Sequence, residues 1–276
     1  MNKKVRVRFA PSPTGHLHIG SVRAAIFNWL FARHHGGQFL VRIEDTDVAR
    51  SKQEYVDSIL QSLSWLNLDS DEPIVYQLSR IEEHKKVVDQ LLEAGLAYPC
   101  FCEPKDLEKT LSDHEKGIAG RYDGTCRNKP YTKDDLQKPH AIRFKLPDDL
   151  RSISFDDVIH GMISVETKQL DDFVILRRDG TPTYNFCVVL DDIHMRITHV
   201  IRGDDHISNT HKQILLYQAL GAQLPQFAHL PLILGPAGNK LSKRDAAVSV
   251  VEYKKKGFLS DALFNYLVRL GWSHGD

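Results

Sequence analysis

The sequence predicts an α/β protein whose parallel sheet is divided by an inserted module. Three observations predict this architecture: a strand–loop–helix–strand order at the start, a polar, cysteine-bearing stretch at about residues 99–150, and a return of alternating elements near Tyr184. Strands that alternate with helices form parallel sheets. The chain has 276 residues, enough for one large domain or two modest ones.

The first unit is a predicted βαβ unit. Residues 5–9 alternate apolar and basic side chains, which is typical of a strand. Residues 11–15, Pro-Ser-Pro-Thr-Gly, end it because proline cannot continue a strand or a helix. A helical pattern begins at Gly20 and stops at Gly36, and residues 39–43 form a second apolar strand.

The remaining elements follow from the same periodicities. We expect helices at 52–66, 80–93, 211–220 and 260–270, and strands at 141–146, 164–166, 173–176, 199–201 and 230–234. The strands between 141 and 176 lack the alternation with helices, which indicates an inserted module.

Composition limits the class of protein. Hydrophobic residues make up 42% and charged residues 26% of the chain, and 36 basic and 36 acidic side chains cancel. The neutral charge counts mildly against a dedicated nucleic-acid binder, although a local basic face remains compatible with it. No apolar run has the length of a membrane span or a signal peptide, so we expect a soluble, cytoplasmic protein without a membrane partner.

The first strand–helix turn contains His16 and His18, within residues 15–21. A helix N-terminus offers free N–H groups to a phosphate, and imidazoles can add hydrogen bonds. Taken alone, the pattern is more typical of a turn with two surface histidines. The glycine patterns of dinucleotide-binding and P-loop sites are absent from the sequence, so a nucleotide site must be built differently.

A basic loop follows the last predicted strand of the sheet. Lys240 and Lys243 lie in Lys-Leu-Ser-Lys-Arg, after Gly235 and Gly238. Mobile lysine charges suit a polyphosphate, whereas the loop alone could be a solvated basic surface.

The two segments together resemble the HIGH and KMSKS elements of class I aminoacyl-tRNA synthetases. His-Ile-Gly-Ser differs from the first at its last position, and Lys-Leu-Ser-Lys-Arg differs from the second at two positions. Further stretches resemble the glutamyl-tRNA synthetase family: residues 8–15, 42–47, 182–186, 200–206 and 269–276.

This resemblance implies a Rossmann-like parallel sheet split by an acceptor-stem-binding α+β module, followed by the start of a helical stem-contact region. The implied boundaries are 1–83 and 186–239 for the two halves of the catalytic domain, 84–185 for the insertion, and 240–276 for the KMSKS-like loop and stem-contact region. Family members also have a helical anticodon-binding region, so the resemblance implies that this chain is a truncated or natural fragment.

The implied reaction joins glutamate to tRNA. ATP with Mg²⁺ activates L-glutamate to glutamyl-adenylate, and the terminal adenosine of the tRNA then takes the glutamyl group through its 2′-hydroxyl. The implied partners are L-glutamate, ATP and a tRNA acceptor stem. The sequence does not give the oligomeric state, for which we favour a monomer.

The resemblance also assigns glutamate-binding residues. Arg8, assisted by Tyr184, should meet the side-chain carboxylate, Glu44 the ammonium group, and Arg202 a carboxylate of the amino acid, while Ala10 and Ser12 line the pocket.

A second set of residues is implied for ATP. The ATP-binding residues are His18, Gly20, Asp205, His206, Lys240 and Lys243. Among these, His18, Lys240 and Lys243 carry the catalytic roles, on the phosphates and the departing pyrophosphate.

Three cysteines predict a metal site. Cys100, Cys102 and Cys126 lie close in sequence, which favours metal over disulfides in a chain without a secretion signal. Some members of the family carry a structural Zn²⁺ in the inserted module. We expect Tyr122 as the fourth ligand, with His114 as its rival, and three reduced cysteines without metal as the alternative. Cys187 lies in a strand-like apolar run and is predicted to be core.

Two other functions remain open. Glutamyl-queuosine tRNA synthetase, a shorter relative that transfers glutamate to a modified tRNA base, often shows the same cysteine pattern. The ending and the Lys-Leu-Ser-Lys-Arg loop favour the glutamate–tRNA ligase. A non-catalytic tRNA-binding module should have lost His18, Lys243 or Arg8, and all three are present.

Overall fold

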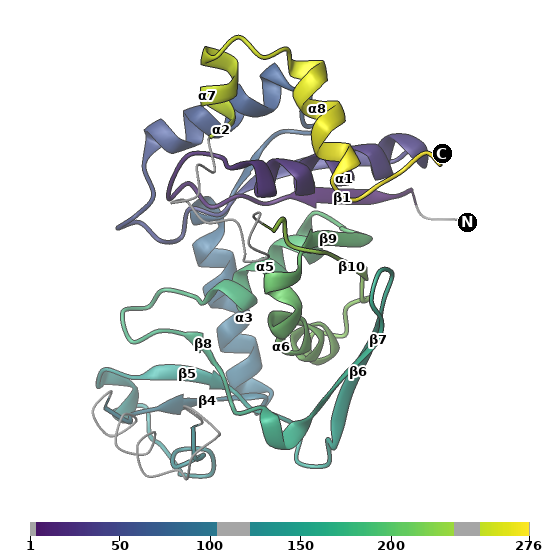
Figure 1. Ribbon diagram of the computed structural model, residues 1–276. Coiled ribbons are helices and arrows are strands. Elements are labelled where there is room, and N and C mark those ends of the chain that lie inside the picture. Colours follow the sequence, from purple (N-terminus) through teal and green to yellow (C-terminus); the bar gives the residue numbers. More distant parts are fainter. Residues whose placement is uncertain (1–3, 104–121, 235–248, 276) are drawn as a thin grey trace.

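The computed structural model describes residues 4–103, 122–234 and 249–275 (Figure 1). Besides a small cluster at Tyr98, Cys100 and Cys126, two large hydrophobic clusters form its interior. One lies around β1 and α1, and the other around the second half of the sheet and the inserted strands.

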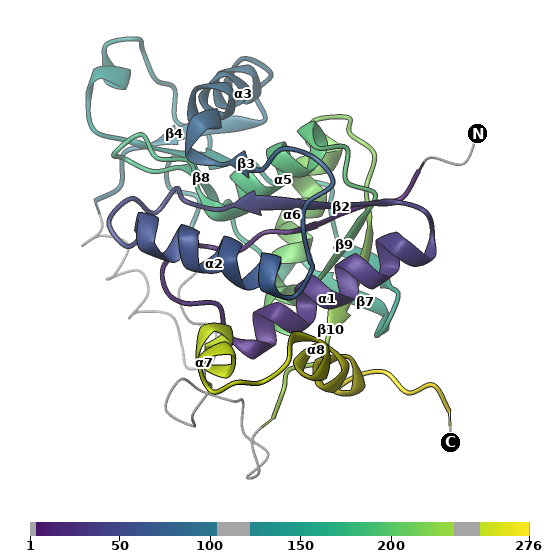
Figure 2. The same cartoon turned by 90° about the horizontal axis from the view of Figure 1, so that it is seen from above.

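The predicted βαβ unit is confirmed. Strands β1 (Arg6–Phe9), β2 (Gln38–Ile43) and β3 (Val75–Tyr76) pair in parallel, with Val7 opposite Phe39. Helices α1 (Ile19–His34) and α2 (Gln53–Trp65) connect them and lie together on one side of the strands (Figure 2). Gly36 ends the first connection with a φ of +58°, a left-handed conformation that glycine adopts without strain.

The second half of the sheet contains β9 (His199–Gly203) and β10 (Gln226–Leu230), which are parallel and joined by α6 (Ile207–Ala219). The N–H of Thr198 donates to the carbonyl of Arg6 over 2.9 Å, so β9 begins beside β1. The loops that leave these two strands therefore emerge next to each other.

Two local predictions in this half were wrong. The run around Cys187 forms helix α5 (Tyr184–His194) rather than a strand, although Cys187 is fully buried as expected. Its apolar residues satisfy both periodicities, and packing on α6 selects the helix. The predicted strand at 230–234 is instead β10, which ends before Pro231 because proline lacks the N–H that a ladder needs.

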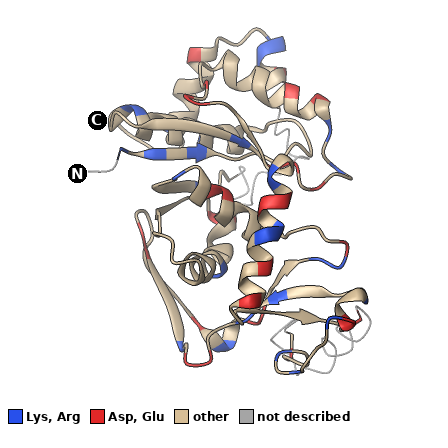
Figure 3. Cartoon of the chain, turned by 180° about the vertical axis from the view of Figure 1, so that it is seen from behind, with Lys and Arg blue, Asp and Glu red and all other residues tan. Residues whose placement is uncertain are grey.

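The intervening segment begins with α3 (Ile81–Glu93), which carries residues of both charge signs (Figure 3) and buries His84, Val88 and Leu91. An antiparallel sheet follows, made of β4 (Ala97–Cys100), β5 (Ala141–Phe144) and β8 (Val174–Leu176). The boundaries at 83/84, 185/186 and 239/240 stay predictions.

A hairpin of β6 (Ser152–Asp157) and β7 (Gly161–Glu166) leaves this segment and joins the parallel sheet. Asp157 pairs with Phe227 of β10, and the N–H of Val158 donates to the carbonyl of Phe227 over 2.9 Å. The intervening segment thus contributes a strand beside β10, which matters for the site below.

Two helices close the described chain, α7 (Val250–Lys255) and α8 (Ser260–Arg269). Helix α8 lies against α1 (Figure 1), where Trp29 and Phe264 meet edge to face. None of the helices in the described ranges combines the length and apolarity that a membrane crossing requires.

Candidate active site

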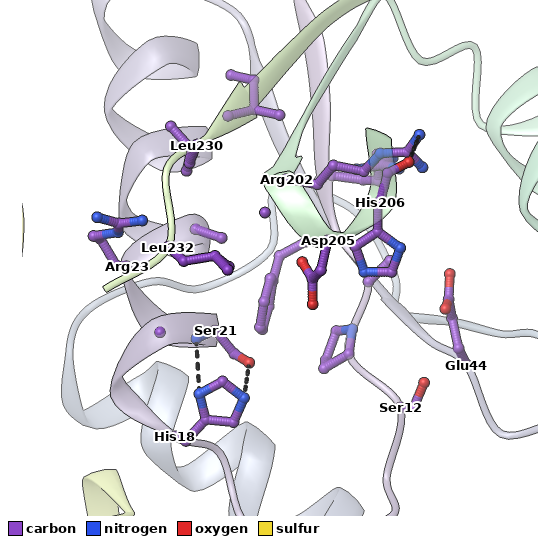
Figure 4. Close-up of a pocket in the computed structure, with 18 of the residues that line it drawn as sticks. Ser12, His18, Ser21, Arg23, Glu44, Arg202, Asp205, His206, Leu230 and Leu232 are labelled. Atoms are coloured by element: carbon purple, nitrogen blue, oxygen red, sulfur yellow. Dashed lines mark hydrogen bonds between the residues drawn. The ribbon is translucent and has the colours of Figure 1, made fainter. Parts of the chain in front are cut away.

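A cavity of about 610 Å³ opens at the carboxyl ends of β1 and β9 (Figure 4). Open α/β sheets bind ligands at this edge, where neighbouring loops diverge. The structure brings together ten predicted site residues as its lining: Arg8, Ala10, Ser12, His18, Gly20, Glu44, Tyr184, Arg202, Asp205 and His206. Lys240 and Lys243 lie outside the described residues.

His18 forms the floor of the cavity and caps α1. Its Nδ1 accepts from the backbone N–H of Ser21 over 3.3 Å, and its Nε2 lies 2.9 Å from the Ser21 hydroxyl (Figure 4). A Cβ added at Gly20 would lie 3.2 Å from the His18 imidazole, which is shorter than an ordinary van der Waals contact. The helix N-terminus therefore faces the cavity with little side-chain bulk, as phosphate binding requires.

Arg8 and Glu44 are linked beneath the cavity by a buried ionic network. Arg8 donates from Nε to Asp192 over 3.0 Å, and Arg42 donates to Asp192 over 2.6 Å and to Glu44 over 3.1 Å. All four side chains are buried. Buried charges are retained only when paired in this way, so the network fixes both pocket residues.

Protonation within this network follows from its charges. Burial opposes the ionisation of Asp192, but Arg8 and Arg42 outweigh it and lower its pKa. Burial raises the pKa of Glu44, an effect that Arg42 and Arg8 offset only in part. Asp192 therefore ionises more readily than an ordinary aspartate, and Glu44 less readily than an ordinary glutamate.

Asp192 and Arg42 were missed by the sequence analysis. The only signal was an Asp-Asp pair inside an apolar helix and an arginine inside an apolar strand. Asp191, which precedes Asp192 in the sequence, is also buried and accepts hydrogen bonds from His84, Gln77 and Arg80, each over 2.8 Å. Adjacent acids thus anchor α5 to two different parts of the fold.

Tyr184 and His206 stand together on one wall. The Tyr184 hydroxyl lies 3.1 Å from Nδ1 of His206. Burial raises the pKa of Tyr184 to about 12, and burial together with Arg202 lowers the pKa of His206 to about 4. Both groups are therefore neutral hydrogen-bonding groups near pH 7.

Arg202 presents one unsatisfied donor. Its Nε donates to Nε2 of His229 over 3.1 Å, and its Nη2 donates to the hydroxyl of Thr210 over 2.7 Å. Its Nη1 is buried and has no hydrogen-bond partner among the described residues. Two of its three nitrogens are therefore fixed by neighbouring side chains, which holds the guanidinium in the wall of the cavity.

The cysteine cluster assembles in space, away from the cavity. The sulfur atoms of Cys100, Cys102 and Cys126 all lie within 4.8 Å of one another. The Tyr122 hydroxyl lies 3.5 Å from the sulfur of Cys100 and accepts from the backbone N–H of Cys126 over 2.7 Å. Three thiols and a phenol at these separations fit a tetrahedral metal ion. His114 lies outside the described residues.

Comparisons with known proteins identify relatives along almost the whole chain. The family of class I tRNA synthetases (E and Q), catalytic domain, matches residues 4–276. Glutamate–tRNA ligases from Thermodesulfovibrio yellowstonii and Nitratidesulfovibrio vulgaris are 55% and 56% identical over 273 residues, which is 99% of this chain and 58% of each relative.

A solved structure agrees with these relatives. The crystal structure of a glutamate tRNA ligase from Elizabethkingia meningosepticum, in complex with its amino acid, is 38% identical with a TM-score of 0.88. It covers 98% of this chain, which spans 61% of that protein. With the fold, the cavity and the match over residues 4–276 in agreement, the chain belongs to the class I tRNA synthetases for glutamate and glutamine, in their catalytic domain.

Proposed function

We propose that this chain activates L-glutamate with ATP and transfers it to the 3′ end of glutamate tRNA. One observation carries the amino-acid part: two buried guanidinium groups, Arg8 and Arg202, line the cavity together with one buried carboxylate, Glu44. The third buried arginine of the lining, Arg23, donates to the backbone carbonyls of Leu270 and Pro231. L-Glutamate carries the complementary set, two carboxylates and one ammonium group. The relatives, of which this chain spans 58%, are named glutamate–tRNA ligases.

Arg8 is proposed to read the side-chain carboxylate. A guanidinium offers parallel N–H donors that match a carboxylate and leave the amide of glutamine poorly paired. Asp192 holds Arg8 through Nε. Because the network beneath the cavity is buried, Arg8 cannot swing to accommodate a different group.

Glu44 is proposed to accept from the substrate ammonium, and Arg202 to bind a carboxylate of the amino acid. Ala10 and Ser12 complete the wall, and the neutral hydroxyl of Tyr184 donates or accepts beside Arg8.

ATP is proposed to lie across the N-terminus of α1. The N–H groups of this helix, the imidazole of His18 and the open face of Gly20 suit phosphates, while Asp205 and His206 line the same cavity. The α-carboxylate oxygen attacks the α-phosphorus and the bond to pyrophosphate breaks. Mg²⁺ enters with ATP and neutralises phosphate charge. Lys240 and Lys243, outside the described residues, are assigned to the departing pyrophosphate by resemblance to the family.

The intervening segment is proposed to meet the tRNA acceptor stem, and α7 and α8 to begin the stem-contact region. The cysteine cluster is proposed to hold a structural Zn²⁺ that ties β4 to the loop carrying Cys126. Tyr122 is assigned as fourth ligand because its hydroxyl lies beside Cys100. The metal's chemistry there is to hold thiolates together; it takes no part in catalysis.

Charging of an unmodified glutamate tRNA transcript with labelled glutamate tests the proposal. A transcript has a 3′ hydroxyl but no modified base, so labelling supports the ligase and excludes transfer to a modified base. Arg8→Gln should abolish labelling with glutamate. Labelling of native tRNA alone would instead support the queuosine-modifying activity, and binding of tRNA without labelling of either would support a non-catalytic module.

A further inference from the structure

Behind Arg202 lie two buried polar residues that are outside the predicted site. His229 on β10 and Asp157 at the end of β6 are almost completely inaccessible to solvent. Nδ1 of His229 lies 2.6 Å from Asp157, and its Nε2 lies 3.1 Å from Nε of Arg202. The three side chains thus form a line from the hairpin strand β6 to the wall of the cavity.

Three side chains surround the imidazole: Asp157 at Nδ1, and at Nε2 both Arg202 and the hydroxyl of Thr210, which lies 3.2 Å away. Arginine can only donate, so Nε2 of His229 must accept from Arg202. The proton of neutral His229 therefore sits on Nδ1 and is donated to Asp157. Burial and the Arg202 charge lower the pKa of His229 to about 4, which keeps the ring neutral at pH 7.

Asp157 is itself held in one orientation. Its Oδ1 accepts from the backbone N–H groups of Ile159 and His160 over 3.0 and 3.1 Å, while Oδ2 accepts from the imidazole. Burial opposes ionisation, but these hydrogen bonds lower the pKa of Asp157. Its oxygens are thus acceptors only, and they select the Nδ1–H tautomer.

The contact with His229 also determines the orientation of the Arg202 guanidinium. Its Nε and Nη2 are held by His229 and Thr210, and Nη1 is left as the unpaired nitrogen. Without an acceptor at Nε, the guanidinium could rotate away from this orientation in the cavity wall.

We propose that Asp157 and His229 are positioning residues, which fix the guanidinium of Arg202 in the wall of the cavity that takes the amino-acid carboxylate. The inference rests on the proposed function for the identity of that carboxylate. It also gives the β6–β7 hairpin a role in amino-acid binding, because Asp157 reaches the site only through the pairing of β6 with β10.

Two matched variants of His229 test the proposal in the full chain. In His229→Gln the terminal oxygen replaces Nε2 and can accept from Arg202, but the bond to Asp157 is lost. In His229→Asn the terminal nitrogen replaces Nδ1 and can donate to Asp157, but the acceptor for Arg202 is lost. Both are neutral amides, so they differ in which of the two contacts survives.

The measurement is the affinity for L-glutamate by calorimetry, with ATP affinity and thermal unfolding as references. We expect His229→Asn to weaken glutamate binding about tenfold or more, the effect of one lost hydrogen bond to a charged group. His229→Gln should stay within about threefold of the unaltered chain. ATP affinity should remain unchanged in both. Equal effects of the two variants, or a stronger effect of His229→Gln, would overturn the proposal.

The tautomer provides a second readout that needs no ligand. In ¹⁵N-histidine-labelled protein, the signal lost in His229→Gln identifies His229. We expect a protonated Nδ1 and a bare Nε2, and a shift toward the opposite tautomer in Asp157→Asn, whose amide can donate to the ring. A proton on Nε2 in the unaltered chain would overturn the proposed contact of His229 with Arg202. Failure of the unaltered chain to bind glutamate would overturn the proposed function. The tautomer of His229 would still show whether Asp157 and Arg202 orient the ring as proposed.

Discussion

The carboxylate of Asp192 lies 2.6 Å from the guanidinium of Arg42, and both side chains are buried beneath the cavity. This pair stands between Arg8 and Glu44, the residues proposed to recognise the two ends of L-glutamate. A substrate-binding arrangement of opposite charges is therefore supported from inside the fold.

Asp192→Asn should destabilise the protein and weaken glutamate binding. The change leaves Arg8 and Arg42 buried with less negative charge, and breaking a buried pair costs about 3 to 5 kcal/mol in the free energy of unfolding. Urea unfolding measures the loss. Glu82→Gln, which removes an exposed partner of Lys85, is the control and should change little. Equal losses in the two variants would contradict the role of the network.

The stabilisation from Asp192 should also depend on pH. Its pKa is lowered in the folded protein, so the contribution is present above the ordinary pKa of an aspartate and is lost as pH falls through the lowered value. Denaturation curves at decreasing pH should therefore converge for the unaltered chain and Asp192→Asn. Curves that stay equally separated would argue against an ionised Asp192.

Glu44→Gln should separate stability from binding. Burial raises the pKa of Glu44, so its ionisation opposes folding above the ordinary pKa of glutamate side chains. Removal of that charge offsets part of the cost of weakening the bond to Arg42, so the loss of stability should be smaller than in Asp192→Asn. Glutamate affinity should fall because the ammonium loses its counter-charge. In the unaltered chain, affinity should decline as pH falls through this raised pKa, and Glu44→Gln should flatten the decline. Calorimetry across pH measures both, and an equally steep decline in Glu44→Gln would contradict the assignment.

His18 has two roles that substitutions can distinguish. His18→Ala removes the cap of α1 and should cost about 1 kcal/mol of stability, whereas His18→Asn keeps a capping acceptor and should cost less. Both should slow activation, by about 100-fold, because neither places an imidazole at the phosphates. Unfolding curves and activation rates provide the comparison. A nearly normal rate in His18→Asn would show that the cap alone matters.

The cysteine cluster should bind one Zn²⁺ per chain. Cys126→Ser should lower the metal content and destabilise the segment around β4, because structural zinc sites contribute folding free energy. Cys187→Ala, a fully buried thiol outside the cluster, is the control and should keep the metal. Elemental analysis after dialysis measures the content. Metal-free protein before any substitution would support three reduced cysteines instead.

The sequence predicted the parts of the site that form contiguous signals. The βαβ unit is confirmed, and the ten described residues assigned by resemblance meet in one cavity. Their chemical roles stay predictions. Local sequence patterns could not reveal side chains whose hydrogen-bond partners lie far away in the sequence, such as Asp192 on α5 or Asp157 on β6. In the sequence each looks like an isolated polar residue, and only the fold shows that Asp192 is buried beside Arg8 and Arg42 and that Asp157 is buried beside His229.

The element boundaries show the same limit. The apolar run at Cys187 satisfies both a strand and a helix, and β10 was placed too late because His229 interrupts its apolar alternation. His229 is buried in the interior, where it contacts Arg202 and Asp157. A hydropathy pattern does not reveal such contacts.

The most direct test of the account is exchange of labelled pyrophosphate into ATP, with glutamate tRNA present, in response to each of three amino acids. The account predicts exchange with L-glutamate, at least about 100-fold less with L-glutamine or L-aspartate, and its loss in Arg8→Gln. Exchange that is absent with L-glutamate, or equally fast with L-glutamine, would contradict the central claim that this cavity selects and activates glutamate.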